Sequence, residues 1–170
     1  RLTPAGGNDA GLAEMWNASD QQWPGGFTRG VPMTAARVAD WMDKQVTILR
    51  LVVIAPDGAV VAYGSLWDEP SQPGRTCYVD LLNVHPDYQG RSLCRRMLTQ
   101  MVDTATAQGY ERMTIGTWSA NMKAVPLYKK VGFFWKPNTT VSMENYIPLL
   151  RRLPILQAFF AEADWYNHYD

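Results

Sequence analysis

The segment from Leu82 to Arg96 constrains the fold of this chain more than any other part of the sequence. An apolar run ends at Val84, a turn containing Pro86 follows, and a helical pattern begins near Ser92. The continuous apolar run indicates a strand that is buried on both faces. A buried strand that leads through a short loop into a long helix is typical of domains in which helices pack on a sheet.

The start of that helix is rich in positive charge. Arg91, Arg95 and Arg96 crowd its first turns, and no carboxylate lies between Gln89 and Thr99. A helix N-terminus already carries about half a positive charge, so cations there are unfavourable unless an anion binds. The free N–H groups of a first helical turn are ready donors for a phosphate. The segment therefore predicts a site for a phosphate-bearing cofactor; the alternative is a helix start with exposed basic residues.

Length and composition restrict the class of protein. A chain of 170 residues suits one domain with a sizeable core. The 16 basic and 16 acidic residues cancel, so no overall charge favours nucleic acid or an anionic membrane as a partner. Cys77 and Cys94 are too few for a disulfide framework, which favours a reducing compartment such as the cytoplasm. The sequence has no apolar run of 18 residues and no metal-ligand spacing, so we expect neither a membrane span nor a metal.

Apolar periodicity and turn residues predict the order of the elements. Helices are expected over residues 9–19, 34–44, 92–108 and 121–130, and from residue 154 onward. Strands are expected over residues 46–54, 59–67, 76–84, 112–117, 133–136 and 139–144. Thr34 is the expected N-cap of the second helix, Gly132 is expected to end the fourth, and Pro126 is expected to kink or weaken it. This order predicts an α/β (α+β) fold, a mixed sheet with helices on both faces.

Two short signatures lie in the order and at the distance of a known family. The first is Val84-His85-Pro86 followed by Gln89-Gly90-Arg91-Ser92-Leu93-Cys94, and the second is Asn121, Leu127-Tyr128 and Gly132-Phe133. With these signatures the chain resembles the GNAT superfamily of acetyl-CoA-dependent N-acetyltransferases, from about Asp9 to Met143. The resemblance implies a mostly antiparallel central sheet of about six to seven strands, although only residues 1–3 remain to supply the first strand.

The first signature departs from the family at Ser92 and Cys94, where small glycine or alanine residues are usual. Glycine lets a phosphate approach the backbone closely, and serine and cysteine are larger. If both residues keep ordinary helical backbone angles, their N–H groups remain available to the ligand. We expect Ser92→Gly to keep or tighten binding of coenzyme A.

The resemblance implies acetyl-CoA as cofactor. The implied cofactor-binding residues are Leu82, Asn83, Val84, Gln89, Gly90, Arg91, Ser92, Leu93, Cys94, Arg95, Asn121 and Tyr128. Main-chain groups at the end of the strand would hold the pantetheine arm, and the backbone after Gln89 would hold the pyrophosphate. Leu82 and Val84 also suit the core, and capping of its own helix is the favoured role of Asn121.

Direct acetyl transfer needs an acid and a base. By resemblance, Tyr128 is the candidate acid, because a phenol with a pKa near 10 can protonate a departing thiolate. An amine with a pKa of about 10.4 is almost fully protonated at pH 7, so a base is required. By resemblance, Asp80 is the first candidate for this base; Glu144 is the second, and a strand-edge salt bridge is the alternative role of Asp80. The loop containing Trp23 and Phe27 is the candidate wall for the acceptor.

These observations predict an N-acetyltransferase that moves an acetyl group from acetyl-CoA to a primary amine in a ternary complex. The alternative is a non-catalytic acyl-CoA sensor or interaction domain on the same fold. We place the acetyltransferase domain over residues 1–146 and a helical extension over residues 147–170. The aromatic end of that extension leaves a homodimer or a further domain open as partner, and the start at Arg1 without Met favours excision from a longer polypeptide.

Overall fold

The computed structural model describes residues 1–23, 26–72, 74–117, 121 and 123–135. Two compact units make up the chain, Arg1–Gly116 and Thr117–Asp170. The expected strand at 139–144, the helix from residue 154, Glu144, the aromatic tail and the boundary at residue 146 all lie outside the described residues.

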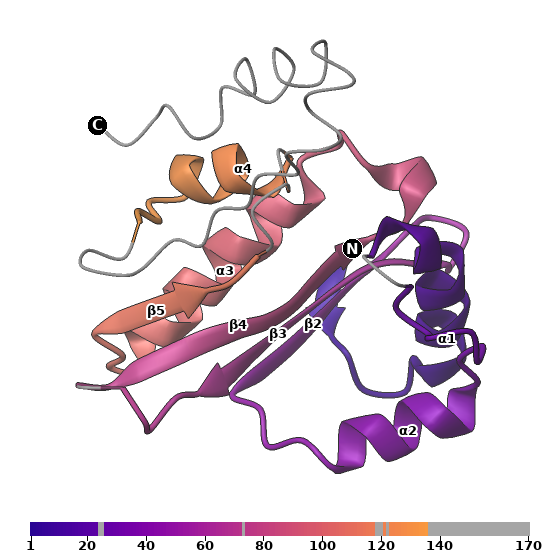
Figure 1. Cartoon of the computed structure of the whole chain (residues 1–170), viewed down its shortest axis with the longest axis horizontal. Helices are drawn as coiled ribbons and strands as arrows, with labels where there is room; N and C mark the ends of the chain where they lie inside the picture. The colour runs from indigo at the N-terminus through magenta and orange to yellow at the C-terminus, as the bar shows by residue number, and fades with distance from the viewer. Residues whose placement is uncertain (24–25, 73, 118–120, 122, 136–170) are drawn as a thin grey trace, which may run out of the picture. The chain divides into compact units, whose positions relative to one another are not determined.

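The first unit is built on a five-stranded sheet with the order β1-β2-β3-β4-β5 (Figure 1). The strands are β1 (Leu2–Pro4), β2 (Leu49–Ile54), β3 (Val60–Asp68), β4 (Thr76–Val84) and β5 (Arg112–Ile115). All neighbours pair antiparallel except β4 and β5, which are parallel. The expected mixed, mostly antiparallel sheet is confirmed, but the described residues form five strands and not six to seven, because residues 133–135 are not extended into a strand.

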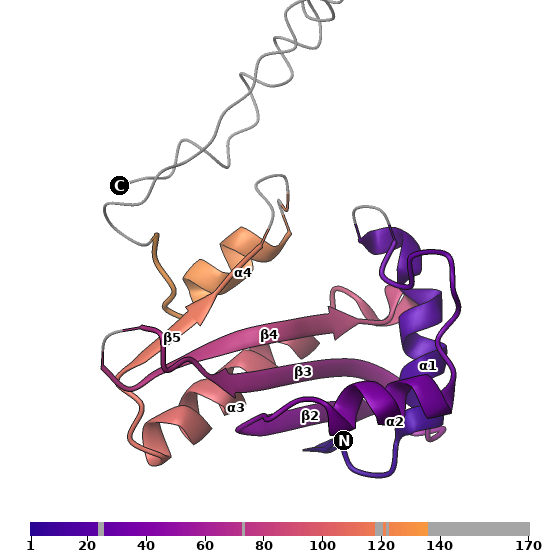
Figure 2. The same cartoon turned by 60° about the horizontal axis from the view of Figure 1, so that its bottom comes forward.

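Helices cover both faces of the sheet, as expected (Figure 2). On one face lie α1 (Asp9–Ala18) and α2 (Ala35–Asp43), and on the other lies α3 (Leu93–Ala107). Short 3-10 turns, η1 (Asp20–Gln22) and η2 (Pro86–Tyr88), precede the loops toward α2 and α3. The predicted cap at Thr34 is confirmed, since its hydroxyl accepts a hydrogen bond from the Arg37 N–H. Within the described residues, no helix is both long and apolar enough to cross a bilayer.

Alternation along β3 assigns its side chains to the two faces. A Cβ on Gly64 would meet the Met101 side chain at 2.5 Å, so the even-numbered residues of β3 face α3. Tyr63 faces the other way, and its ring lies 5.3 Å from that of Trp16 in α1. Trp16 also contacts Trp41 of α2 at 5.2 Å between ring centroids, edge to face. This aromatic cluster joins both helices to the sheet, and each fully buried ring contributes about 1.5–3 kcal/mol.

The strand ends differ from the sequence prediction in two places. β2 begins at Leu49 and not at residue 46, and the Val46 side chain is 91% exposed. A β-branched residue favours a strand, but without a partner strand that preference decides nothing. The short remnant at the N-terminus does supply the first strand, because Leu2 pairs with Val53 on the free edge of β2.

The second unit contains α4 (Ala124–Lys130) among its described residues. Pro126 is the third residue of α4, a position where no helical hydrogen bond needs its N–H, so a proline is tolerated there. Lys129 and Lys130 occupy the last turn, where positive charge is favourable. Gly132 follows the C-cap with φ +99°, so the predicted helix end is confirmed.

Candidate functional site

The end of β4 has an open edge. Its parallel pairing with β5 stops where Val79 lies opposite Ile115, because β5 ends there whereas β4 continues to Val84 (Figure 1). Residues 80–84 continue to pair with β3 but meet no strand on the β5 side among the described residues. Backbone N–H and C=O groups on that edge are therefore available to an amide-containing ligand.

A β-bulge shapes β4 at the same point. Leu66 of β3 pairs with Val79, but Gly64 pairs with Leu82, so only Ser65 lies opposite Asp80 and Leu81. A bulge turns two successive side chains toward one face. Leu81 joins the core beneath α1 and α2, and Asp80 lies beside Ser65 on that same face.

Asp80 is half-buried, and burial raises the pKa of its carboxyl above the ordinary value. The nearby Ser65 hydroxyl lowers the pKa in part, although it forms no hydrogen bond of ordinary geometry. No cation within 4.0 Å pairs with Asp80 among the described residues, so the salt bridge weighed as its alternative role is not found there. A carboxylate with a raised pKa and no ion pair is a suitable proton acceptor.

The loop between η2 and α3 exposes a row of backbone donors. In the described part of the chain no hydrogen bond involves the N–H groups of residues 90–95, while that of Arg96 bonds to the Ser92 carbonyl. Gly90 has φ +74° and no atom within 4 Å of the position a Cβ would take. A ligand phosphate can therefore approach this backbone without a steric conflict.

Ser92 departs from the ordinary helical conformation considered for it. It is the N-cap of α3 with φ +58° and ψ +20°, in the left-handed region, and its side chain makes no capping hydrogen bond. This region favours glycine, so the family's usual residue would fit this backbone better. Cys94 is the second residue of α3, and burial raises the pKa of its thiol to about 11, which keeps it neutral.

The three arginines differ in their surroundings. The Arg91 guanidinium lies over the Tyr88 ring, 4.6 Å from its centroid, and donates to the Asp87 carbonyl. Arg95 and Arg96 line a shallow surface groove along α3, together with Leu2 of β1. None of the three pairs with an acid within the described residues, so their charges stay available to an anion.

The three predicted residues at the end of β4 lie on different faces. Leu82 faces α3, because its side chain comes within 3.2 Å of a Cβ built on Gly64. Asn83 lies opposite Tyr63 on the other face and is 5% exposed, and its Oδ1 atom has no hydrogen-bond partner in the described part of the chain. Val84 is buried. The main chain of these residues borders the open edge, whereas their side chains pack inward.

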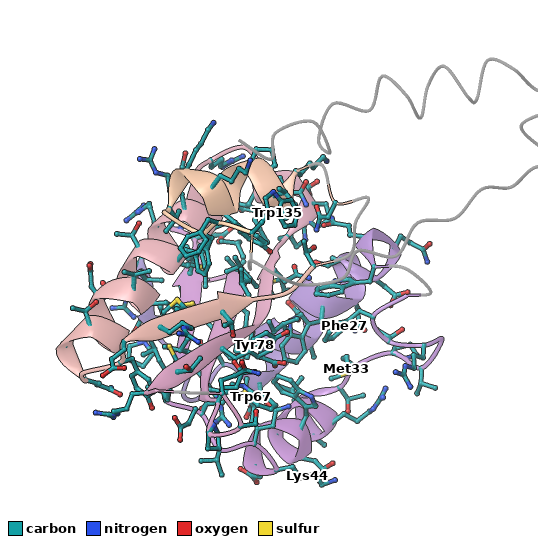
Figure 3. All side chains as sticks on the ribbon, turned by 60° about the vertical axis from the view of Figure 1, so that its left-hand side comes forward. Phe27, Met33, Lys44, Trp67, Tyr78 and Trp135 are labelled. Atoms are coloured by element: carbon teal, nitrogen blue, oxygen red, sulfur yellow. The ribbon has the colours of Figure 1, made fainter. Side chains whose placement is uncertain are left out.

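The two aromatic residues of the predicted acceptor wall pack against the core. Phe27 lies 5.3 Å from Trp16, and Trp23 lies 5.4 Å from Phe27, measured between ring centroids. The 3-10 turn η1, which directly precedes Trp23, contacts the segment that joins η2 to α3 (residues 89–95, the phosphate loop), because the Gln89 side-chain amide donates to Gln22 at 2.6 Å. Figure 3 shows Phe27 beside α1, on the side of the sheet that also carries Trp67 and Tyr78.

In the second unit, Asn121 and Tyr128 belong to the same segment. The Asn121 Oδ1 atom accepts a hydrogen bond from the Ala124 N–H at the start of α4, and its amide donates to the Thr117 hydroxyl. Tyr128 lies in α4, half-buried, with its ring 6.1 Å from that of Phe133.

Comparison with known proteins identifies the family. The model of the acetyltransferase (GNAT) family matches residues 12–133. The chain belongs to this family. The L-amino acid N-acyltransferase MnaT of Escherichia coli K12 is 33% identical over 98 residues, which are 57% of this chain and 57% of that protein. An L-methionine sulfoximine/L-methionine sulfone acetyltransferase of Salmonella typhimurium is 31% identical over 101 residues, or 59% of each chain. The chain thus spans less than two thirds of these relatives.

Solved structures agree on the GNAT fold. An acetyltransferase of Trypanosoma brucei superposes with a TM-score of 0.64 at 17% identity, covering 85% of this chain and 99% of that one. AAC(6')-Iy in complex with a bisubstrate analog, CoA-S-monomethyl-acetylneamine, gives a TM-score of 0.62 at 14% identity, covering 85% of this chain and 97% of that one. At such low identity these likenesses establish the fold alone.

Proposed function

We propose that this GNAT chain is an N-acetyltransferase that transfers an acetyl group from acetyl-CoA to the primary amine of a small molecule. Family membership supports acyl transfer, and two features of the described structure fit the cofactor. The open edge of β4 after Val79 offers main-chain partners to the amides of pantetheine. The free N–H groups of residues 90–95 and the unpaired arginines beside them suit a pyrophosphate.

Different residues of this chain carry out the proton transfers that the reaction needs, one from the acceptor ammonium and one to the departing thiolate. Acetyl-CoA supplies the reactive thioester. Asp80, with its raised pKa, accepts the proton of the acceptor ammonium directly or through a water. Backbone N–H groups at Leu82 to Val84 polarise the thioester carbonyl. Tyr128 donates its phenolic proton to the departing thiolate, which leaves neutral coenzyme A, and the second proton lost by the attacking nitrogen restores the phenol.

The relatives guide the choice of acceptors. One is named for L-amino acids and another for L-methionine sulfoximine and L-methionine sulfone, all small molecules that carry a primary amine. We therefore expect small amines of this kind to be better acceptors for this chain than lysine side chains of folded proteins.

Release of free thiol from acetyl-CoA, measured with a broad panel of amines, tests the proposed function. Acetylation of at least one small amine above the rate without acceptor supports it. Binding of coenzyme A without turnover on any amine contradicts it and favours the acyl-CoA sensor. A hundredfold excess of ligand over its Kd adds about 2.7 kcal/mol of stability, so a thermal shift detects binding independently. No shift at millimolar coenzyme A contradicts both functions.

A further inference from the structure

Arg50 is a partly buried cation without an acidic partner. It lies in β2, and its Nη2 atom donates to the carbonyls of Met42 and Gln45, at 2.6 and 2.7 Å, where α2 ends. Its Nε atom is closed to solvent and has no hydrogen-bond partner among the described residues. Neither ion pair found among the described residues involves Arg50. Removing a charge from water without an opposite charge is costly, so this arginine is suited to receive an anion.

The sheet places Arg50 in line with Asp80. Arg50 pairs with Ser65 of β3, and Ser65 lies opposite the bulge that carries Asp80. Residues directly opposite each other on neighbouring strands point to the same face, so all three side chains share the face beneath α1 and α2. A positive group and a carboxylate thus lie about two strand spacings apart, or about 10 Å between backbones.

A polar row across the sheet contains Arg50, Ser65 and Asp80, and it includes a second donor without a hydrogen-bond partner in the described residues. Trp67 lies two residues after Ser65 on the same strand and pairs with Tyr78 of β4. Its Nε1 atom is closed to solvent and lacks a hydrogen-bond partner among the described residues, as the Arg50 Nε atom does. Figure 3 shows Trp67 and Tyr78 next to each other on the sheet. Two unpaired N–H donors and one carboxylate on one face complement a ligand that carries both an anionic and a cationic group.

From this arrangement we propose that the acceptor is a free α-amino acid, with its carboxylate held by Arg50 and Trp67 and its amine directed to Asp80. The inference rests on the proposed N-acetyltransferase function and specifies its acceptor class. A carboxylate accepts hydrogen bonds from a guanidinium and an indole N–H in one plane, whereas an amide offers one neutral acceptor oxygen and leaves the charge of Arg50 unpaired, and a second ammonium offers no acceptor. Because both N–H groups are closed to solvent, we expect the half-buried Trp67 side chain to rotate so that its N–H meets the entering carboxylate.

Paired acceptors test this assignment on the whole chain. We would compare kcat/KM for L-methionine with that for L-methioninamide, which keeps the amine and side chain but lacks the carboxylate. The amino acid is expected to be preferred by about 100-fold, as for the loss of a charged hydrogen-bond pair. Equal rates for the two, or a preference for the amide, overturn the inference and leave the acetyltransferase intact. Absence of turnover on every amine instead contradicts the proposed function.

Variants test whether Arg50 causes the preference for the amino acid over its amide. In Arg50→Gln the ratio between acid and amide is expected to fall toward 1, mainly through a loss with the amino acid. Arg112→Gln on β5, an exposed arginine outside this row, is the matched control and should keep the ratio. Arg50→Lys retains the charge if Arg50→Gln fails to fold, and it should keep a reduced preference because one ammonium replaces a planar fork. An unchanged ratio in a folded Arg50 variant removes Arg50 from the site.

Discussion

The phosphate loop (residues 89–95) and the polar row beneath α1 and α2 (Arg50, Ser65, Trp67 and Asp80) differ in whether solvent reaches their unpaired hydrogen-bonding groups. In the phosphate loop, six consecutive backbone N–H groups lack partners among the described residues, and the arginines around them are exposed. In the polar row, the unpaired groups are side-chain atoms of Arg50, Ser65 and Trp67, all closed to solvent. The first region is ready to bind before the ligand arrives, whereas the second has to open.

This difference has a physical reason. A pyrophosphate is the same in every acetyl-CoA, so a fixed backbone cradle is sufficient and needs little from side-chain identity. An acceptor has to be distinguished from other amines, and buried donors that stay unpaired with the wrong ligand provide that distinction. Changes in the polar row should therefore alter catalysis and selectivity, while changes in the phosphate loop should alter cofactor affinity and stability.

The largest effect is expected for Asp80→Asn. Loss of a general base lowers kcat/KM by about 100- to 10,000-fold, whereas the Kd of coenzyme A should stay the same, because the phosphate loop is untouched. Thiol release and calorimetric titration measure the two quantities. The matched control is Asp103→Asn, an exposed acid on α3, which should leave kcat/KM unchanged. Activity close to wild type in Asp80→Asn would remove the assigned role.

The same substitution, Asp80→Asn, is expected to raise stability although it lowers activity. Burial raises the pKa of the Asp80 carboxyl in the folded state, so between the unfolded-state pKa and the raised pKa the unfolded state holds fewer protons, and the ionised carboxylate disfavours folding. This contribution is fully stabilising below the unfolded-state pKa and is lost as the pH rises through the raised pKa. Asp80→Asn should thus raise Tm at pH 7 and not at pH 3. A lower Tm at pH 7 would contradict this.

The next largest effect is expected for Tyr128→Phe. Removing the phenolic hydroxyl should lower kcat by about 100-fold while the Kd of coenzyme A changes little, because only the proton for the departing thiolate is lost. Phenylalanine keeps the ring contact with Phe133, so the fold of α4 is expected to persist. An equal loss of kcat and of coenzyme A affinity would assign Tyr128 to binding and not to proton transfer.

Features set by neighbours in the sequence were predictable, and those set by strand register were not. The Thr34 cap and the helix end at Gly132 were predicted because each depends on one turn of backbone. Asp80 was singled out by resemblance, but its position beside Ser65 depends on a bulge that no local pattern reveals. Arg50 was missed, although it is the only charged residue in an otherwise apolar strand, which is the signal that marks it. Its importance appears only once β2 lies beside β3.

A smaller effect is expected from the exposed arginine on α3. Arg95→Gln should weaken coenzyme A binding by about 3- to 10-fold, because an exposed charge acts on the phosphates across solvent. The weakening should shrink as salt is raised from 0.05 to about 0.5 M, where screening removes most of the attraction. Calorimetric titration at both salt concentrations measures it, and the Asp80-dependent pH profile of turnover should not move. A salt-independent loss would indicate a direct packing role.

The smallest effect is expected from Ser92→Gly, and it tests whether the phosphate loop stores strain. Serine at φ +58° destabilises the folded state by about 1–2 kcal/mol, and glycine removes this strain. The larger unfolded-state entropy of glycine offsets about half of the gain. The net gain of about 0.5–1 kcal/mol should raise Tm by about 1–3 °C without weakening coenzyme A binding. Ser71→Gly is the matched control, since Ser71 is exposed and does not have positive φ, so the same substitution should lower Tm. Ser92→Ala keeps the strain and removes the hydroxyl; if it alone weakens binding, the hydroxyl and not the backbone contacts the cofactor.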